Sequence, residues 1–206
     1  MSTKILVVFY STYGHVYQLA LAAEEAAKKE GAEVRLRRVA ETLPQEVLTK
    51  MHATEAQKAF AHVPLATPDD LEWADGSIWA SPTRFGAVAS QMKAFMDSLG
   101  GVWMKGAVIG RPAAAMTSTA TQHGGNEVTI ISGFWPFFAH LGLAIVGLPY
   151  SFPDQSGVEA VKGCSPYGAS TISGANGERL PSPSELAGAQ FQAQHLTRIA
   201  SSLAAK

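Results

Sequence analysis

The sequence predicts one α/β domain built on a parallel sheet. Short apolar runs alternate with longer amphipathic ones, the pattern of strands joined by crossover helices. The chain has 206 residues, 47% hydrophobic and 16% charged, enough to bury a substantial core. Its first run, residues 4–10, is nearly unbroken in β-branched and aromatic side chains, as in a central parallel strand covered on both faces.

The elements of the first half follow this alternation. Residues 16–30 are rich in Ala, Leu and Glu and predict a helix that ends at Gly31. Residues 33–39 alternate polar and aliphatic side chains, which predicts a second strand near an edge of the sheet. Prolines interrupt residues 41–75, so we expect an excursion from the domain there, with a short helix at about 45–60.

The second half ends with the clearest local signal of the chain. Ser182, Pro183 and Glu185 place a capping serine, a proline at the first helical position and a glutamate three residues after the cap, which predicts a helix from 183 to about 203. Residues 150–180 are rich in Gly, Ser and Pro and predict a loop insertion. The remaining expected elements are strands at 76–80, 112–117 and 143–148 and helices at 88–99 and 128–141.

Composition excludes several classes of partner. A net charge of -1 offers no basic surface for nucleic acid or an anionic membrane. Residues 128–153 are uncharged but are cut by glycines and prolines, so we expect no membrane span. One cysteine, Cys164, can form neither an internal disulfide nor a structural zinc site, which favours a reducing cytoplasm; its thiol is assigned no role.

Charge is unevenly distributed. Between residues 112 and 153 the only formally charged side chain is that of Glu127. A deeply buried core layer would explain this, but the stretch also contains expected loops. We therefore favour a ligand site combined with a subunit interface, because large apolar patches seldom face water without a partner.

Polar loops follow three of the predicted strands. Ligands of open parallel sheets bind at the carboxyl ends of the strands, where the strand order reverses. Residues 11–15 place hydroxyls and a glycine at a helix N-terminus, which makes a neutral cradle for an anion. The loops at 81–86 and 118–125 are also small, hydroxylated and glycine-containing. The sequence lacks the Gly-x-Gly-x-x-Gly, P-loop, Gly-x-Ser-x-Gly and His-Glu-x-x-His motifs, so a mononucleotide with a planar ring fits best.

Five motifs occur in order along nearly the whole chain. They are Tyr-Ser-x-Tyr-Gly-His at 10–15, Pro-Thr-Arg-Phe-Gly at 82–86, Gly-Gly-x-Trp at 100–103, Ser-Thr followed by His-Gly-Gly-x-Glu within 118–127, and Pro-Tyr-Gly-Ala at 166–169. This series resembles the WrbA family, flavodoxin-like FMN-dependent NAD(P)H:quinone oxidoreductases (type IV), and among them the benzoquinone reductases. The resemblance implies a three-layer sandwich with helices on both faces of a five-stranded parallel sheet in the order 2-1-3-4-5, and FMN at its switch point.

Carried over position by position, the resemblance implies a complete site. His140 would reach the flavin pocket, either of its own chain or of a neighbouring subunit, and His140 and Tyr13 are the catalytic candidates. Tyr13, Phe85 and Trp103 would contact NADH or NADPH and the quinone. The residues implied to hold FMN are Ser11, Thr12, Tyr13, Gly14, His15 and Val16 at the phosphate, Pro82, Thr83, Arg84, Phe85 and Gly86 along the ring, and Ser118, Thr119, Ala120, Thr121, Gln122 and Gly124 on its other side, together with His140.

Two departures from the family pattern affect this transfer. The loop after the fourth strand is about one residue longer, with Gln122 and His123 where glycines often stand. Pro136 lies inside the helix expected at 128–141, where it should kink or split the helix and move His140. On residues alone, His140 fits a core histidine and Trp103 a packing anchor, so both interpretations stay open.

The predicted reaction is a ping-pong, two-electron reduction of quinones to hydroquinones by NAD(P)H through bound FMN. Two alternatives stay open: an electron carrier of the flavodoxin type, and an FMN-binding regulatory protein without turnover. A carrier would dock through a strongly acidic face, which a net charge of -1 does not provide. The family resemblance further implies a homodimer or homotetramer.

Overall fold

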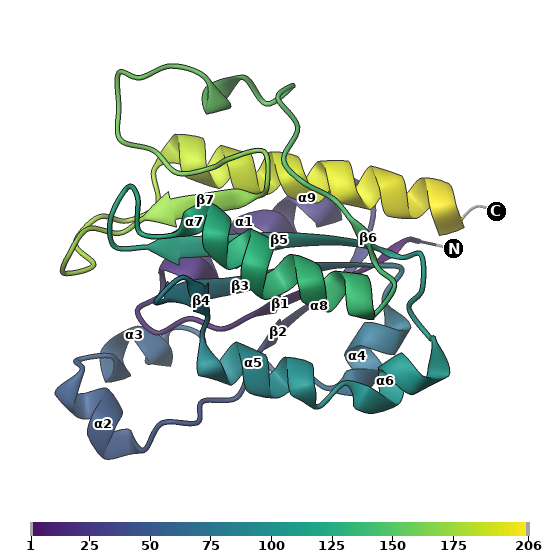
Figure 1. Ribbon diagram of the computed structural model, residues 1–206, viewed down its shortest axis with the longest axis horizontal. Coiled ribbons are helices and arrows are strands. Elements are labelled where there is room, and N and C mark those ends of the chain that lie inside the picture. Colours follow the sequence, from purple (N-terminus) through teal and green to yellow (C-terminus); the bar gives the residue numbers. More distant parts are fainter. Residues whose placement is uncertain (1, 205–206) are drawn as a thin grey trace.

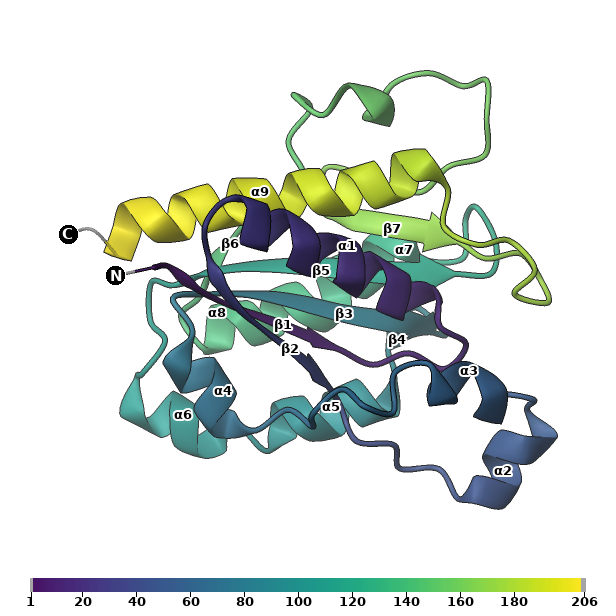
Figure 2. The ribbon, with the colours of Figure 1, turned by 180° about the vertical axis from the view of Figure 1, so that it is seen from behind.

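The computed structural model describes residues 2–204, which form a parallel sheet with helices on both faces (Figures 1 and 2). The strands along the sheet follow the order β2-β1-β3-β5-β6, with β7 also pairing β5 and β4 pairing β3. Within residues 2–204, no helix is long and apolar enough to cross a bilayer. The α/β class predicted from the sequence is confirmed.

The centre of the sheet is the predicted first strand. β1 (Lys4–Phe9) pairs in parallel with β2 (Glu33–Arg38) on one side and with β3 (Gly76–Arg84) on the other. Its side chains alternate between two cores, with Ile5 in one and Leu6 in the other. β2 lies at the edge of the sheet and is mostly half-buried, as its polar alternation predicts.

Helices cover the two faces unequally. α1 (His15–Lys29) and α9 (Pro183–Ala204) pack side by side on one face. α4 (Pro68–Trp73), α5 (Ser90–Asp97) and α6 (Gly100–Lys105) cover the other, together with the helical segment at 126–140. The predicted cap of α9 is confirmed: Ser182 N–H donates to Glu185 Oε2 (2.7 Å), and Glu185 N–H donates to Ser182 Oγ (3.2 Å).

The prediction of exactly five strands is wrong. β5 (Pro112–Thr119) pairs at its start with β6 (Ala144–Ile145) and at its end with β7 (Ala169–Ile172), so two short strands share the fifth position. The expected strand at 143–148 shrinks to two residues because the chain leaves the sheet before the insertion and re-enters after it. β4 (Ala87–Val88) turns back against β3. The sequence of β7, Ala-Ser-Thr-Ile, carries no apolar run, so this strand falls within the loop insertion predicted at 150–180.

Two helical segments are interrupted, one of them unexpectedly. The helix predicted at 45–60 is two helices, α2 (Gln45–Lys50) and α3 (Thr54–Lys58), separated by a turn in which His52 has φ 55°. The segment containing Pro136 is α7 (Asn126–Val128), a π-helical stretch Thr129–Phe134 and α8 (Trp135–His140). The helix expected at 128–141 is therefore divided next to Pro136, where the hydrogen-bonding pattern changes, in line with the kink or split predicted for this proline.

Candidate active site

A cavity of about 590 Å³ lies at the carboxyl ends of β1, β3 and β5. This edge of the sheet is on the left in Figure 1. Eleven predicted site residues line the cavity, namely Ser11, Thr12, Tyr13, His15, Val16, Pro82, Thr83, Arg84, Ser118, Thr119 and Ala120. The three predicted strand-end loops therefore meet at one cavity.

The N-terminus of α1 forms one wall. Gly14 precedes the helix with φ 91°, a conformation that glycine adopts easily, and its N–H donates to Ser11 Oγ (3.0 Å). The first hydrogen bond of the helix runs from Gln18 N–H to Gly14 C=O (3.1 Å), so the helix supplies no acceptor for the N–H groups of the three preceding residues. These N–H groups and the helix dipole favour an anion at this end.

The end of β3 forms a second wall. Arg84 donates from its guanidinium to Thr12 Oγ1 (2.6 Å) and to Thr83 C=O (2.9 Å), which ties this wall to the first loop. The chain then turns into β4 through Phe85 and Gly86, both with positive φ. Phe85 is fully exposed to solvent, and neither Phe85 nor Gly86 lines the cavity. The structure therefore does not bring Phe85 and Gly86, both predicted to lie along the flavin ring, into the lining of the cavity.

The loop after β5 contributes only its first residues. Ser118, Thr119 and Ala120 line the cavity, whereas Thr121, Gln122 and Gly124 lie outside its lining. Thr119 Oγ1 donates to Thr121 C=O (2.8 Å), and Gly124 N–H donates to the same carbonyl (3.2 Å). These bonds fold the glycine-containing part of the loop onto itself, away from the cavity.

A further wall, Ser173–Gly177, was missed by the sequence analysis. It follows β7, and Ser173 N–H donates to Thr119 C=O (2.8 Å), so it continues the pairing with β5. His15 Nε2 lies 3.0 Å from Gly177 C=O and joins this wall to α1. The sequence does carry a signal here, because Gly174, Asn176 and Gly177 form a turn-prone cluster, but this cluster falls within the insertion predicted at 150–180 and follows no predicted strand.

Glu185 holds this wall in place. Its carboxylate is fully buried and accepts N–H bonds from Gly163 (2.8 Å), Ile172 (3.2 Å) and Ser182 (2.7 Å), as well as an ion pair from Arg179 (2.9 Å). Burial by itself raises the pKa of Glu185, but these bonds outweigh it and hold the pKa below its ordinary value. The charged form therefore fixes the chain on both sides of Ser173–Gly177.

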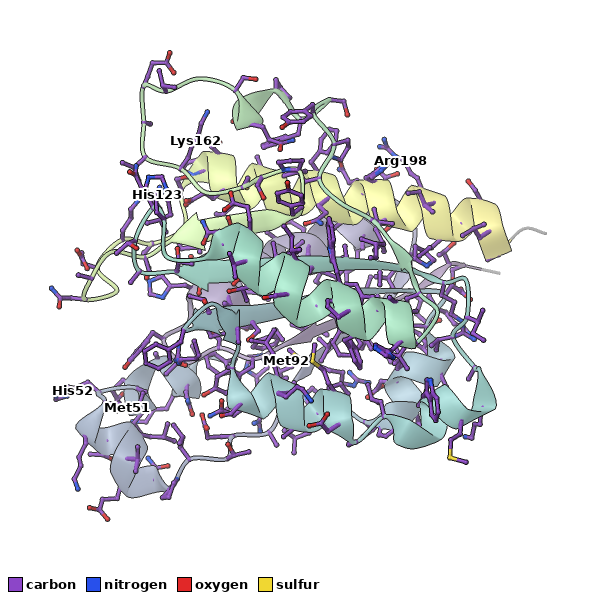
Figure 3. The ribbon with its side chains drawn as sticks, in the orientation of Figure 1. Met51, His52, Met92, His123, Lys162 and Arg198 are labelled. Carbon is purple, nitrogen blue, oxygen red and sulfur yellow. The ribbon has the colours of Figure 1, made fainter. Side chains whose placement is uncertain are left out.

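An arm made of α2 and α3 closes the outer side of the cavity. Met51 and His52, on the turn between these helices, line it and lie at this edge of the molecule (Figure 3). Tyr13 Oη donates to Met51 C=O (3.1 Å). Glu41, at the start of the arm, accepts from Tyr10 Oη (2.8 Å). The bend of the arm depends on His52 in a left-handed conformation, which sequence patterns do not reveal.

Glu41 and Tyr10 have displaced pKa values. Burial raises the pKa of Glu41, but hydrogen bonds from Leu43 N–H, Gln91, Gln57 and Tyr10 outweigh this and lower it. The pKa of Tyr10 is raised, chiefly by burial and also by the neighbouring Glu41 carboxylate. The tyrosine is therefore a neutral donor, and Glu41 a charged acceptor, at neutral pH.

Trp103 and His140 lie elsewhere in the chain. They meet in a separate hollow of about 240 Å³, between α6 and the end of α8. These elements are at the opposite end of the sheet from the cavity (Figure 1). Within one chain the structure does not bring the predicted Trp103 and His140 to the cavity.

The chemistry offered by the cavity is that of binding and orientation. Among the described residues that line it, Arg84 is the only one with a permanent charge. The others supply hydroxyls, backbone N–H groups and two imidazoles, and no group of three or more potential metal ligands occurs within residues 2–204. Such walls suit an anionic ligand with a planar body.

Comparisons with known proteins agree with this geometry. The model of the family described as NADPH-dependent FMN reductase matches residues 3–150. Two curated relatives called NAD(P)H dehydrogenase (quinone), from Geobacter metallireducens and Geobacter sulfurreducens, are each 52% identical over 201 residues, 97% of this chain and 98% of the relative. The crystal structure of a flavodoxin, WrbA-like protein from Agrobacterium tumefaciens superposes with a TM-score of 0.69 at 19% identity, covering 98% of this chain and 99% of that one.

Proposed function

The chain belongs to the NADPH-dependent FMN reductase family, and from this premise we propose how its cavity serves an FMN-dependent NAD(P)H:quinone oxidoreductase. The protein reduces quinones with NADH or NADPH as the electron donor. The observation that carries this function is the cavity: three strand-end loops, converging at the switch point of a flavodoxin-like sheet, offer neutral donors beside one arginine.

The donor set fits FMN. We propose that the N–H groups at the start of α1 hold the phosphate, with Gly14 leaving room because a Cβ built there meets nothing within 4 Å. Thr83 and Arg84 would face one side of the ring system, and Ser118 to Ala120 the other. The hydroxyls of Thr119 and Ser173 would serve the ribityl chain. The volume of about 590 Å³ lies within the usual range of ligand pockets.

FMN, when bound, supplies the two-electron chemistry by which reducing equivalents pass from NAD(P)H to the quinone. The task of the chain is to orient the two flat substrates and to exclude water. Arg84 places a positive charge beside the cavity, which favours negative charge that develops there. Tyr13 lines the mouth, with its hydroxyl bonded to Met51 C=O, so it positions substrate from a fixed site. We propose a ping-pong order, in which NAD(P)H binds, reduces the protein and leaves before the quinone binds.

We expect the purified protein to carry a yellow flavin or to take up FMN when it is supplied. Anaerobic NADH or NADPH should bleach the flavin absorbance, and benzoquinone should restore it without a ternary complex. Absorption spectra and steady-state kinetics check both steps. A protein that binds no FMN, or whose flavin the coenzymes leave oxidised, contradicts the proposed function.

We further propose that a second copy of the chain brings Trp103 and His140 to the mouth of the cavity. Trp103 is 58% exposed, and its neighbours Met104 and Ile109 are 80% and 70% exposed, so this end of the molecule presents an apolar surface that suits a subunit contact. A homotetramer would account both for the distance of Trp103 and His140 from the cavity of their own chain and for this apolar surface. The free thiol of Cys164 supports action in a reducing cytoplasm.

Light scattering is expected to give a mass four times that of the 21.8 kDa chain. Replacing His140 by alanine should lower turnover although His140 is remote from the cavity of its own chain. A mass fixed at one chain across concentrations, with full activity of His140→Ala, would refute the shared site.

A further inference from the structure

A second hollow, of about 460 Å³, adjoins the cavity and has no assigned ligand. We call it the annex. It lies between the arm and α5, and its wall includes Tyr10, Leu43, Val88, Gln91 and Lys93. Met51 and Arg84 line both the annex and the main cavity, so the two spaces are adjacent. A ligand longer than a flat ring could occupy both.

The inner wall of the annex offers apolar contact. Tyr10 Oη and Gln91 Nε2 both donate to Glu41, at 2.8 and 2.7 Å. Two backbone N–H groups and Gln57 Nε2 also donate to this carboxylate. Because these polar groups satisfy one another, a ligand meets the faces of Leu43, Met51 and Val88 instead.

The charge that the annex presents is positive. Arg84 and Lys93 line it, and Glu41 lies behind the wall with its carboxylate occupied by donors. Lys93 pairs with Asp97 one turn along α5, but both side chains are largely exposed, at 59% and 65%. Such surface pairs are weak, so a more highly charged anion can recruit the ammonium group.

We propose that the annex binds the adenosine diphosphate half of NADH or NADPH while the nicotinamide enters the main cavity. The adenine ring would lie against the apolar wall, and the pyrophosphate beside Arg84 and Lys93. A quinone carrying an aliphatic chain would use the wall but would offer no negative charge to either cation. The inference rests on the proposed function, since it places the coenzyme of that reaction.

The test compares NADH with reduced nicotinamide mononucleotide, which lacks the adenosine half, as reductants of the FMN-loaded protein. In rapid-reaction measurements, Lys93→Ala should raise the Kd for NADH roughly fivefold with the limiting rate of flavin reduction unchanged. The Kd for the mononucleotide and the rate of reoxidation by benzoquinone should not change. Lys29→Ala, which removes another exposed lysine paired one turn away with Glu25, is the matched control and should alter nothing.

Leu43→Trp, which fills the annex, should lower the affinity for NADH toward that for the mononucleotide. The inference is overturned if both annex variants bind NADH as wild type does, or if they weaken only quinones that carry an aliphatic chain. These results leave the proposed function standing, because NADH still reduces the flavin. If neither reductant reduces the wild-type flavin, the function fails and the inference with it.

Discussion

Replacing Glu185 by alanine is expected to lower the free energy of unfolding by about 3–5 kcal/mol and to weaken FMN binding by about tenfold or more. The substitution leaves Arg179 without its buried partner and removes the acceptor of three backbone N–H groups. Because those N–H groups flank Ser173–Gly177, the far wall of the cavity loses its anchor. Chemical denaturation and FMN titration measure the two effects.

Glu25→Ala is the control for this prediction, since Glu25 forms an exposed ion pair with Lys29. It should change stability by less than about 0.5 kcal/mol and leave FMN affinity intact. Equal effects of the two variants, or an unaltered FMN affinity in Glu185→Ala, would show that the carboxylate does not support the site.

The same carboxylate makes stability depend on pH. The folded-state pKa of Glu185 lies below its ordinary value of about 4.3, so its contribution is present above that value and is lost as pH falls through the folded-state pKa. Glu185→Gln keeps the shape but does not titrate. Wild type should therefore lose more stability than this variant as the pH falls below about 4.3, while Asp70 and Glu41, whose pKa values are also lowered, act equally in both proteins.

Local signals explain what the sequence predicted well. β1, α1 and α9 each carry their own pattern: a continuous apolar run, an amphipathic period ended by a glycine, and a capping box with a proline. Their ends fall within a residue or two of expectation. Such elements are specified by neighbours in the chain, so a single sequence suffices to find them.

The missed elements depend on distant partners. β7 is a strand because β5 offers it a free edge, and its hydroxyl-bearing residues give no periodic signal. This error concealed the Ser173–Gly177 wall, although residues from all three predicted loops line the cavity, at 11–13, 15–16, 82–84 and 118–120. The roles of Trp103 and His140 stay predictions, because in the proposed assembly these residues act at the cavity of a second chain.

Substitutions of two glycines that flank α1 distinguish an effect on stability from an effect on FMN binding. Gly14 and Gly31 stand just before and just after α1, with φ values of 91° and 85°, and a Cβ at either position meets nothing within 4 Å. Valine at either position should therefore cost a similar amount, about 1–3 kcal/mol of backbone strain. Only Gly14 lies at the N-terminal end of α1, between the cavity-lining residues Tyr13 and His15.

Gly14→Val is thus expected to raise the Kd for FMN by about 10- to 100-fold, because relief of the strain turns charge-assisted N–H donors away from the phosphate. Gly31→Val should lose comparable stability yet bind FMN as wild type does. Titration with riboflavin, which lacks the phosphate, separates the causes: its affinity should fall little in Gly14→Val. If riboflavin and FMN weaken equally, the damage lies in the ring site or the fold, and the helix N-terminus is not the phosphate cradle.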